Sequence, residues 1–318
     1  MNAINGYELL GELSTQNAGF GKWGFCEKGG REYFIKEFLT PVYPADNIEL
    51  SAKIIERKRK ACVDFYFEKR EFYDVLSRCR TGNNILVQDF FRSGSKYYIV
   101  TDKVIADGTD PAIISKLSRE KKETLIRSIL YSIAKLHDVG IVHADIKPDN
   151  ILLKKTNGGF YTAKIIDFDS GFLVYKTPSE VQGDFVYLAP EVYLKMNDEE
   201  VELNEKLDIF ALGILLHQYW TGELPKIGAD YRYAFEAVLD GSEIQLNNAI
   251  PLEFRKTISG MLSADPASRP GAREVLQVFR ARDETPTPIK PDPPPNSRVK
   301  MSPGIKMSAG FYVPNDLD

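Results

Sequence analysis

The sequence predicts an α+β protein in which a small antiparallel sheet with one long helix precedes a larger helical region. Residues 7–40 are rich in aromatic residues and short apolar runs, and Gly29-Gly30 separates two of these runs as a hairpin turn would. From Asp110 onward, apolar residues recur instead at spacings of three and four, the period of a helix. A chain of 318 residues is long enough for two packed lobes.

The remaining elements follow in chain order. Residues 47–78 have helical character, and 86–88 and 97–100 are expected to be strands on either side of a turn at 92–95. A helix is expected to end near Gly140, because four apolar residues before it share one face. These residues are Leu125, Ile129, Ile133 and Leu136. Further helices are expected around 204–221, 230–239, 252–263 and 271–280, and the Pro-rich composition of residues 284–318 predicts a flexible tail.

Composition limits the classes of function. A net charge of −4 gives no basic field of the kind that nucleic-acid binding requires. The longest apolar run, residues 209–220, is too short to span a bilayer, and the N-terminus lacks the features of a signal peptide. Three cysteines without a CxxC pair fit a reducing cytoplasm better than a disulfide scaffold or a zinc site. We therefore expect a cytoplasmic protein with no nucleic-acid or membrane partner.

Two short segments carry the chemistry. His143-Ala144-Asp145-Ile146-Lys147-Pro148-Asp149-Asn150 is followed by Ile165-Ile166-Asp167-Phe168-Asp169. Together they supply carboxylates, a lysine and an amide. Phosphoryl transfer needs these groups around one nucleotide, because a hydroxyl must be oriented, charge on the phosphoryl group neutralised and a metal held.

The order Asp-x-Lys-x-x-Asn followed by Asp-Phe resembles the catalytic and metal loops of eukaryotic-type serine/threonine protein kinases. The resemblance covers about residues 7–282 and implies a two-lobed kinase fold, with a small antiparallel-sheet lobe, a large helical lobe and MgATP between them. Ala189-Pro190-Glu191 resembles the end of the family's activation segment, and Arg269 is placed like the arginine that pairs with that glutamate. Asp208 matches the buried aspartate that holds the catalytic-loop backbone. The short lobes and lean loops resemble bacterial members of the family.

The resemblance implies a role for each site residue. Asp145 would orient the acceptor hydroxyl and accept its proton, and Lys147 would neutralise charge on the moving phosphoryl group. Asn150 and Asp167 would hold Mg²⁺. Lys36, which ends the apolar run Tyr33-Phe34-Ile35, would contact the ATP phosphates and pair with a helix glutamate. Glu71 fits that glutamate best, and Glu68, one turn earlier, is the alternative. His143 is expected to be a structural residue that packs near Phe168.

The nucleotide site departs from the family pattern. Aligning Phe20-Gly21-Lys22-Trp23 on the family's Phe-Gly-x-Val puts Gln16 and Ala18 where glycines usually approach phosphates, so the loop is expected to be shaped differently. Trp23 and Phe34 stand where Val and Ala usually pack on adenine, and they either narrow the pocket or fill it. The other predicted pocket residues are Leu152 as its floor, Thr101 as the gatekeeper and Asp102-Lys103-Val104 as the hinge.

The two loops also carry substitutions. Asp169 replaces the glycine of Asp-Phe-Gly, and an aspartate tolerates the positive φ that glycine permits there better than most residues do. It also offers an extra oxygen for the metal. Ala144 replaces the arginine of His-Arg-Asp, so a phosphate on the activation segment would lack its usual partner.

The function expected from these residues is Mg-dependent transfer of the ATP γ-phosphate to Ser/Thr hydroxyls of proteins, including autophosphorylation. The alternatives are a pseudokinase scaffold, which the weak loop and the two large rings favour, and a small-molecule phosphotransferase, which Ala189-Pro190-Glu191 and Arg269 disfavour. The expected divisions are an N-lobe over 1–101, the hinge and C-lobe over 102–283, and the tail over 284–318. The tail carries Ser and Thr residues, and it is expected either to reach the cleft and be self-phosphorylated or to be an inert solvated segment; it also offers a place for a phosphatase or signalling partner.

Overall fold

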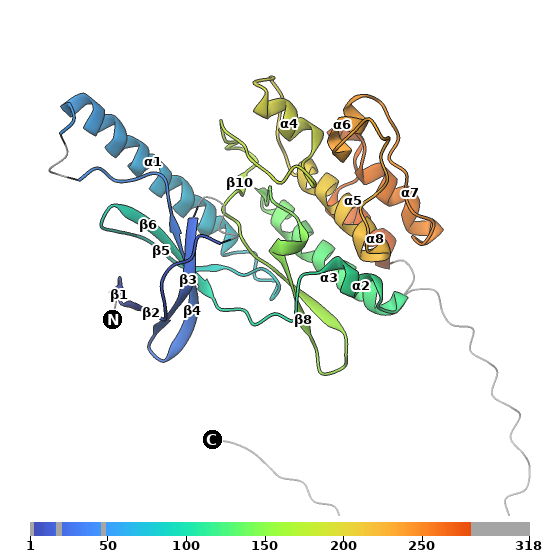
Figure 1. The fold of residues 1–318 in the computed structure, drawn as a ribbon, viewed down its shortest axis with the longest axis horizontal. Coiled ribbons are helices and arrows are strands. Elements are labelled where there is room, and N and C mark those ends of the chain that lie inside the picture. Colours follow the sequence, from blue (N-terminus) through green and yellow to red (C-terminus); the bar gives the residue numbers. More distant parts are fainter. Residues whose placement is uncertain (1–2, 17–20, 46–48, 281–318) are drawn as a thin grey trace, which may run out of the picture. The chain divides into compact units, whose positions relative to one another are not determined.

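The structure is a computed structural model that describes residues 3–16, 21–45 and 49–280. Its first part contains a six-stranded antiparallel sheet in the order β1-β2-β3-β4-β6-β5 (Figure 1). The expected hairpin joins β3 to β4, where Gly29 and Gly30 have φ of 62° and 76°. The strands are β1 (Ala3–Ile4), β2 (Tyr7–Leu9), β3 (Gly21–Lys28), β4 (Arg31–Phe38), β5 (Val87–Ser93) and β6 (Lys96–Asp102).

One long helix, α1 (Ala52–Leu76), accompanies the sheet, as the sequence predicted. Its C-terminal half packs on the sheet through aromatic side chains. Tyr73 meets Phe90 of β5 with ring centroids 5.3 Å apart, and Phe65 meets Tyr97 of β6 at 5.2 Å. The last turns of α1 are therefore fixed against the strands, which sets the direction in which each of its side chains points.

The second part is mainly helical and lies on the other side of the fold from the sheet in Figure 1. The predicted helices are present with slightly different bounds, and the long internal helix α5 ends where Gly222 takes a left-handed conformation with φ of 82°. The helices are α2 (Pro111–Ser115), α3 (Arg119–Asp138), α4 (Pro190–Met196), α5 (Lys206–Thr221), α6 (Ala234–Leu239), α7 (Leu252–Met261) and α8 (Ala272–Arg280).

Two small antiparallel ribbons that the sequence did not predict frame the chemistry-bearing loops. β7 (Ile141–Val142) pairs with β10 (Phe172–Leu173), and β8 (Ile151–Lys155) pairs with β9 (Tyr161–Ile165). Residues 143–150 run from β7 to β8, and residues 166–171 run from β9 to β10. The pairing of the ribbons therefore brings the two predicted loops side by side.

A buried ion pair closes the helical part. Arg269 donates from Nη1 to Glu191 Oε1 at 2.7 Å and from Nη2 to Oε2 at 2.8 Å. The two side chains are 0% and 5% exposed, so the pair lies in the protein interior. The pairing that the sequence predicted for Glu191 is confirmed.

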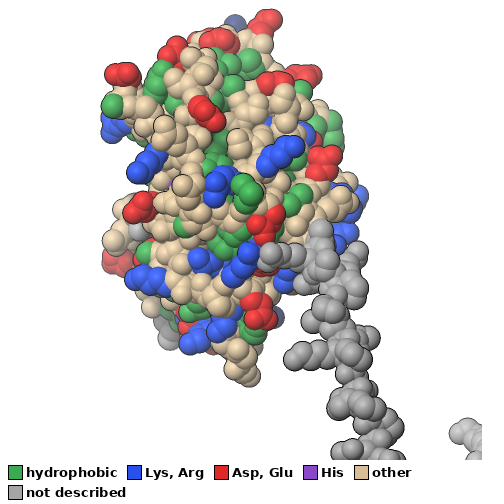
Figure 2. Space-filling model, turned by 90° about the vertical axis from the view of Figure 1, so that its right-hand side faces the viewer, with side chains coloured by type: hydrophobic (Ala, Val, Ile, Leu, Met, Phe, Trp, Pro, Cys, Tyr) green, Lys and Arg blue, Asp and Glu red, His purple; other side chains and the backbone are tan. Residues whose placement is uncertain are grey.

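Acidic and basic side chains are interspersed on the face drawn in Figure 2. Within the described residues, we find no helix with both the length and the apolarity needed to cross a membrane. The predicted tail, residues 284–318, lies outside the described residues.

Candidate active site

The turn that begins at His143 is held by a side chain of α5. Asp208 accepts hydrogen bonds from the backbone N–H of His143 and of Ala144, both at 2.8 Å, and its carboxylate lies 3.0 Å from His137 Nε2. Ala144 has φ of 63°, a left-handed conformation that alanine rarely adopts. Asp208 therefore fixes an otherwise unfavourable turn, and its predicted tethering role is confirmed.

The turn gathers three of the predicted site residues. Lys147 Nζ lies 3.0 Å from Asp145 Oδ2, and Asn150 Nδ2 donates to the same oxygen and to the Asp145 carbonyl, each at 2.8 Å. The Asp145 side chain is 15% exposed, so it is largely enclosed but reachable. His143 is fully buried, with its ring centroid 4.8 Å from that of Phe168, as expected of a structural residue.

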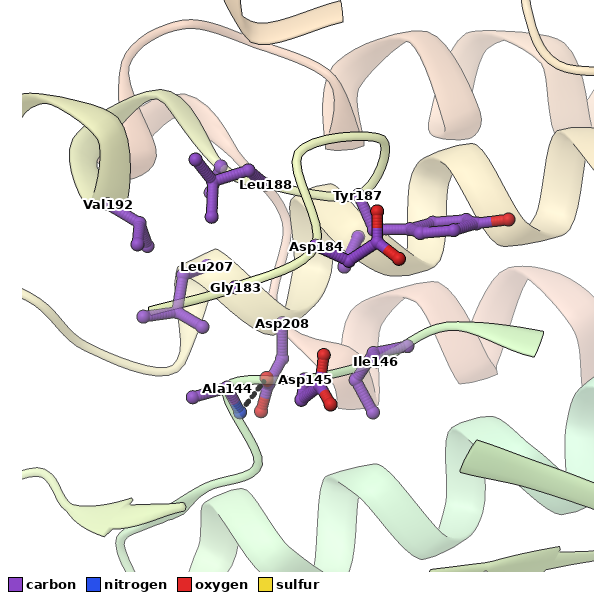
Figure 3. A pocket seen from close by; sticks show the side chains of 12 residues that line it. Ala144, Asp145, Ile146, Gly183, Asp184, Tyr187, Leu188, Val192, Leu207 and Asp208 are labelled. Atoms are coloured by element: carbon purple, nitrogen blue, oxygen red, sulfur yellow. Dashed lines mark hydrogen bonds between the residues drawn. The ribbon is translucent and has the colours of Figure 1, made fainter. Parts of the chain in front are cut away.

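A small hollow lies beside Asp145 (Figure 3). It is lined by residues 144–146, by side chains of α4 and α5, and by the segment that precedes α4, which contributes Gly183, Asp184 and Tyr187. Its volume of about 20 Å³ is room for roughly one water molecule. Asp184 had not been singled out from the sequence, although it lies directly upstream of the Ala189-Pro190-Glu191 motif.

Lys36 meets the second loop. Its Nζ lies 3.0 Å and 3.2 Å from the two carboxylate oxygens of Asp167, and 2.6 Å from Asp169 Oδ2. Burial alone would lower the pKa of Lys36, but the carboxylates of Asp169 and Asp167 outweigh it and the pKa is raised. Lys36 therefore keeps its positive charge, and β4 delivers it to both aspartates.

The backbone of this loop differs from the expectation. The residue in the left-handed region is Asp167, with φ of 59°, and Asp169 is not among the residues with positive φ. Asp169 is thus accommodated without the strain that the loss of a glycine implied. The buried glycine of the loop is instead Gly171, where a Cβ would lie 2.6 Å from Phe72 Cζ.

The predicted partner of Lys36 is wrong. Glu71 accepts hydrogen bonds from Tyr175 Oη at 3.0 Å and Lys176 Nζ at 3.2 Å, and Glu68 lies 3.6 Å from the same Lys176 Nζ. The side chains of Glu71 and Glu68 are 43% and 57% exposed. Both glutamates therefore hold the segment after β10 at the surface and do not contact Lys36.

Helix phase explains this correction. The inward face of α1 is defined by the buried residues Phe72, Tyr73 and Leu76. At roughly 100° per residue, Lys69 lies at the centre of that face, while Glu71 lies on the opposite side of the helix. Lys69 Nζ accordingly reaches inward and donates to the Asp169 carbonyl at 2.5 Å. Counting the phase from the apolar residues would have indicated Lys69 from the sequence.

The predicted adenine-side residues lie on neighbouring strands. Trp23 stacks on Phe34 with ring centroids 5.8 Å apart and planes 21° apart, and Trp23 Nε1 donates to the Gln16 carbonyl at 2.7 Å. Phe34 is directly opposite Thr101 in the register of β4 and β6, and Asp102 ends β6 with its carboxylate 2.7 Å from Arg31. Leu152, which lies in β8, and Val104, which follows β6, are both partly buried. Ala18 lies outside the described residues.

Gly21 shows that Lys36 needs free space above it. A Cβ at residue 21 would lie 3.0 Å from both Lys36 Cε and the Glu37 carbonyl. Any other residue would push the lysine side chain aside. A glycine at this position therefore leaves room for the Lys36 side chain, whereas Gln16 and Ala18 occupy the two positions at which the family pattern has glycines.

The donor set fits magnesium that arrives with a nucleotide. Mg²⁺ is usually held by one or two carboxylates together with phosphate oxygens and water, and Asn150 and Asp167 offer an amide and a carboxylate of this kind. A dedicated cluster of three or more His, Cys, Asp or Glu side chains suited to a metal is absent from the part of the chain that the structure describes.

Comparison with known proteins agrees with this geometry. The protein kinase domain family matches residues 44–279. The chain is 26% identical over 242 residues to a probable myosin light chain kinase of Dictyostelium discoideum, covering 71% of this chain and 72% of the relative. It is 27% identical to calcium/calmodulin-dependent protein kinase type II of Caenorhabditis briggsae, covering 80% of this chain, and 35% identical to a Wee1-like protein kinase of Oryza sativa subsp. japonica, covering 47%. The chain spans 49% and 27% of the length of the latter two relatives. The chain belongs to the protein kinase domain family.

Proposed function

We propose that this chain is an active kinase that transfers the γ-phosphate of MgATP to Ser and Thr hydroxyls of proteins. The observation that carries the proposal is the bonded set of Asp145, Lys147 and Asn150, held in one turn by Asp208. A scaffold protein would not need these groups in hydrogen-bond contact. Lys36 and Asp167 supply the remaining charges that phosphoryl transfer uses.

Each group has a chemical task in this proposal. Asp145 accepts a hydrogen bond from the acceptor hydroxyl, orients it and takes its proton as the phosphoryl group is transferred. Lys147, already beside Asp145, neutralises charge on the phosphoryl oxygens, and Lys36 binds the ATP phosphates. Asn150 and Asp167 would hold Mg²⁺, which supplies charge neutralisation on the phosphates when it is bound.

The choice of a protein hydroxyl as acceptor rests on the sequence pattern and the relatives. Lys147 follows the serine/threonine pattern of the catalytic loop, and the three relatives described above carry names of protein kinases.

Three buried free thiols, Cys26, Cys62 and Cys79, are consistent with a reducing cytoplasmic compartment. We infer the same division into an N-lobe, a C-lobe and a tail that the sequence predicts.

The test is phosphate incorporation from labelled MgATP into the purified protein and into generic protein substrates. Asp145→Asn removes the proton acceptor and is expected to lower the rate by roughly 10²–10⁴-fold. Asp149→Asn, an exposed carboxylate in the same loop, is the matched control and should stay within about twofold of the wild type. Equal rates for Asp145→Asn and the wild type would end the proposal.

Autophosphorylation has its own readout in the same reaction. Thr285, Thr287, Ser297, Ser302 and Ser308 belong to the chain that follows α8, so a tethered acceptor has a high effective concentration. Mass spectrometry after incubation with MgATP should find phosphate on some of these residues. A tail that stays unmodified while other substrates are labelled would exclude this part of the proposal.

A nucleotide-binding scaffold is the second candidate, and one observation favours it. Lys36 is already bonded to two carboxylates and has no glutamate partner from α1. Under this alternative, MgATP would raise the melting temperature without any phosphate being transferred. Incorporation that is lost in Asp145→Asn would exclude it.

A further inference from the structure

We propose that Asp169 is the positioning residue for Lys36, in the role that the family resemblance assigned to a glutamate of α1, and that Lys69 of α1 fixes Asp169 in place. This inference rests on the proposed function, since Lys36 must be aligned to bind ATP phosphates. It assigns a task to the residue that replaces the glycine of the Asp-Phe-Gly motif.

The contacts single out Asp169. Its Oδ2 lies 2.6 Å from Lys36 Nζ, closer than either oxygen of Asp167, at 3.0 Å and 3.2 Å. The Lys36 and Asp169 side chains are only 10% and 17% exposed, and a pair that is shielded from solvent is held more strongly than a surface pair. Glu71 is engaged elsewhere, with Tyr175 and Lys176.

Lys69 completes the arrangement. It occupies the inward position of α1 and donates to the carbonyl of Asp169 at 2.5 Å, so the helix still bonds to the loop. A lysine cannot pair with Lys36, but its charge favours a carboxylate nearby. Compared with the arrangement that the family resemblance implies, the carboxylate that pairs with Lys36 lies on the loop, at Asp169, and the inward position of the helix holds a cation, Lys69.

The geometry distinguishes positioning from metal binding. Asp169 Oδ1 is buried and has no hydrogen-bond partner, and its other oxygen is bonded to Lys36. Both oxygens of Asp167 also contact Lys36, but its side chain is 34% exposed against 17% for Asp169, so Asp167 is the more accessible of the two to a metal that arrives with a nucleotide. Asp169 is oriented toward Lys36 and the interior, so its contribution acts through the lysine.

The kinetic test compares two carboxylate-to-amide substitutions in the full-length protein. Asp169→Asn is expected to lower kcat/KM for ATP by roughly tenfold to a hundredfold, mainly through a higher KM, because a misaligned Lys36 binds phosphates poorly. Glu71→Gln is the matched control and should stay within about twofold. Loss of activity in Glu71→Gln with a harmless Asp169→Asn would overturn the inference and reinstate the helix glutamate.

A charge exchange tests the positioning role directly. Lys69→Glu alone is expected to lower kcat/KM by roughly tenfold or more, since it places a third carboxylate beside Asp167 and Asp169. Adding Asp169→Gly to it recreates the family arrangement and should recover most of that loss. A double variant that is no better than Lys69→Glu alone would contradict the exchange.

Thermal unfolding of the nucleotide-free protein separates this inference from the proposed function. Asp169→Asn should lower the melting temperature in the wild type but not in a Lys36→Met background, where the carboxylate has already lost its cation. Additive shifts would overturn the pairing. A wild-type protein that transfers no phosphate would reject the proposed function, while this unfolding cycle would still decide whether Asp169 holds Lys36.

Discussion

Ala144 shows how a single residue can depend on a distant one. Its left-handed conformation would be unfavourable in isolation, yet the turn that presents Asp145 requires it. Asp208 compensates by accepting the two backbone N–H groups of His143 and Ala144. The position of Asp145 is therefore set by a carboxylate on a buried helix.

Asp208→Asn is expected to damage this turn. An asparagine has one acceptor oxygen, so one of the two backbone N–H groups would face an amide NH₂ and lose its bond. We expect a fall in stability of about 1–3 kcal/mol, measured by urea unfolding, together with a lower kcat. Asp198→Asn is the control, because Asp198 is also left-handed but exposed and asparagine suits that conformation. Wild-type kcat and stability in Asp208→Asn would contradict the tether.

Arg269→Met is expected to be among the most destabilising single changes. It leaves Glu191 charged and buried without its partner, which typically lowers the free energy of unfolding by about 3–5 kcal/mol. Arg273→Met provides the comparison, since Arg273 pairs with Asp138 at the surface, where its side chain is 64% exposed. That change should lower stability by less than about 1 kcal/mol. Equal effects in chemical denaturation would mean that burial does not set the strength of the pair.

At the residue scale, the contacts of a side chain could be predicted from the sequence where its neighbours form a motif. Asp208, the Glu191–Arg269 pair and the packing of His143 were predicted in this way and are confirmed. Lys69 was not predicted, because a lysine in a highly charged helix looks like a surface residue. Only its phase relative to buried aromatic residues distinguishes it.

At the scale of elements, long periodic segments were predictable and short ones were not. The helix α3 lies where its apolar spacing indicated, and α5, α7 and α8 lie within the ranges where helices were expected, to within a residue or two. The two-residue strands β7 and β10 carry no periodicity, and they exist because the loops around them are held by tertiary contacts. Their pairing, which sets the geometry of the site, was therefore beyond a reading of the sequence alone.

Replacing glycine by alanine is expected to have opposite effects on stability at two helical positions. In α7, a Cβ at Gly260 would lie 3.8 Å from Pro270 Cδ, an ordinary contact, so Gly260→Ala should stabilise by about 0.5–1 kcal/mol through helix propensity. In α5, a Cβ at Gly213 would lie 2.8 Å from Leu262 Cδ2 and 3.2 Å from Met261 Cβ, so Gly213→Ala should destabilise. If both variants raised the melting temperature, the side chains around Gly213 would have to shift and accept the added methyl group, which would contradict the prediction for α5.

At the scale of the whole molecule, one apolar core joins the two parts. It includes Phe38 and Tyr97 of the sheet, Leu76 of α1, and Phe210 and Phe254 of the helical part. Because these side chains form a continuous cluster, residues 21–45 and 49–280 are expected to unfold together.

The free energy of unfolding should depend on pH partly through His217. Burial lowers the pKa of His217, whose Nδ1 lies 2.9 Å from the Glu223 carbonyl and whose Nε2 accepts from Asn247 N–H at 3.2 Å. The unfolded chain then binds a proton more readily than the folded one, so this residue's contribution is complete above the ordinary histidine pKa of about 6.5 and is lost as pH falls below it. His217→Gln should weaken the loss of stability between about pH 7.5 and 5.5, measured by urea unfolding. Identical pH profiles would contradict a neutral buried imidazole.

The exchange between Lys69 and Asp169 also bears on how such a chain can change over generations. Changing Asp169 to glycine alone removes one of the two carboxylate partners of Lys36, and changing Lys69 to glutamate alone crowds carboxylates together. Each intermediate is therefore expected to be less fit than either end state, so the two arrangements are separated by a valley that a single substitution does not cross. A lineage that has acquired this arrangement would tend to keep it, and a lysine at this helix position together with an aspartate in this loop would be inherited as a pair.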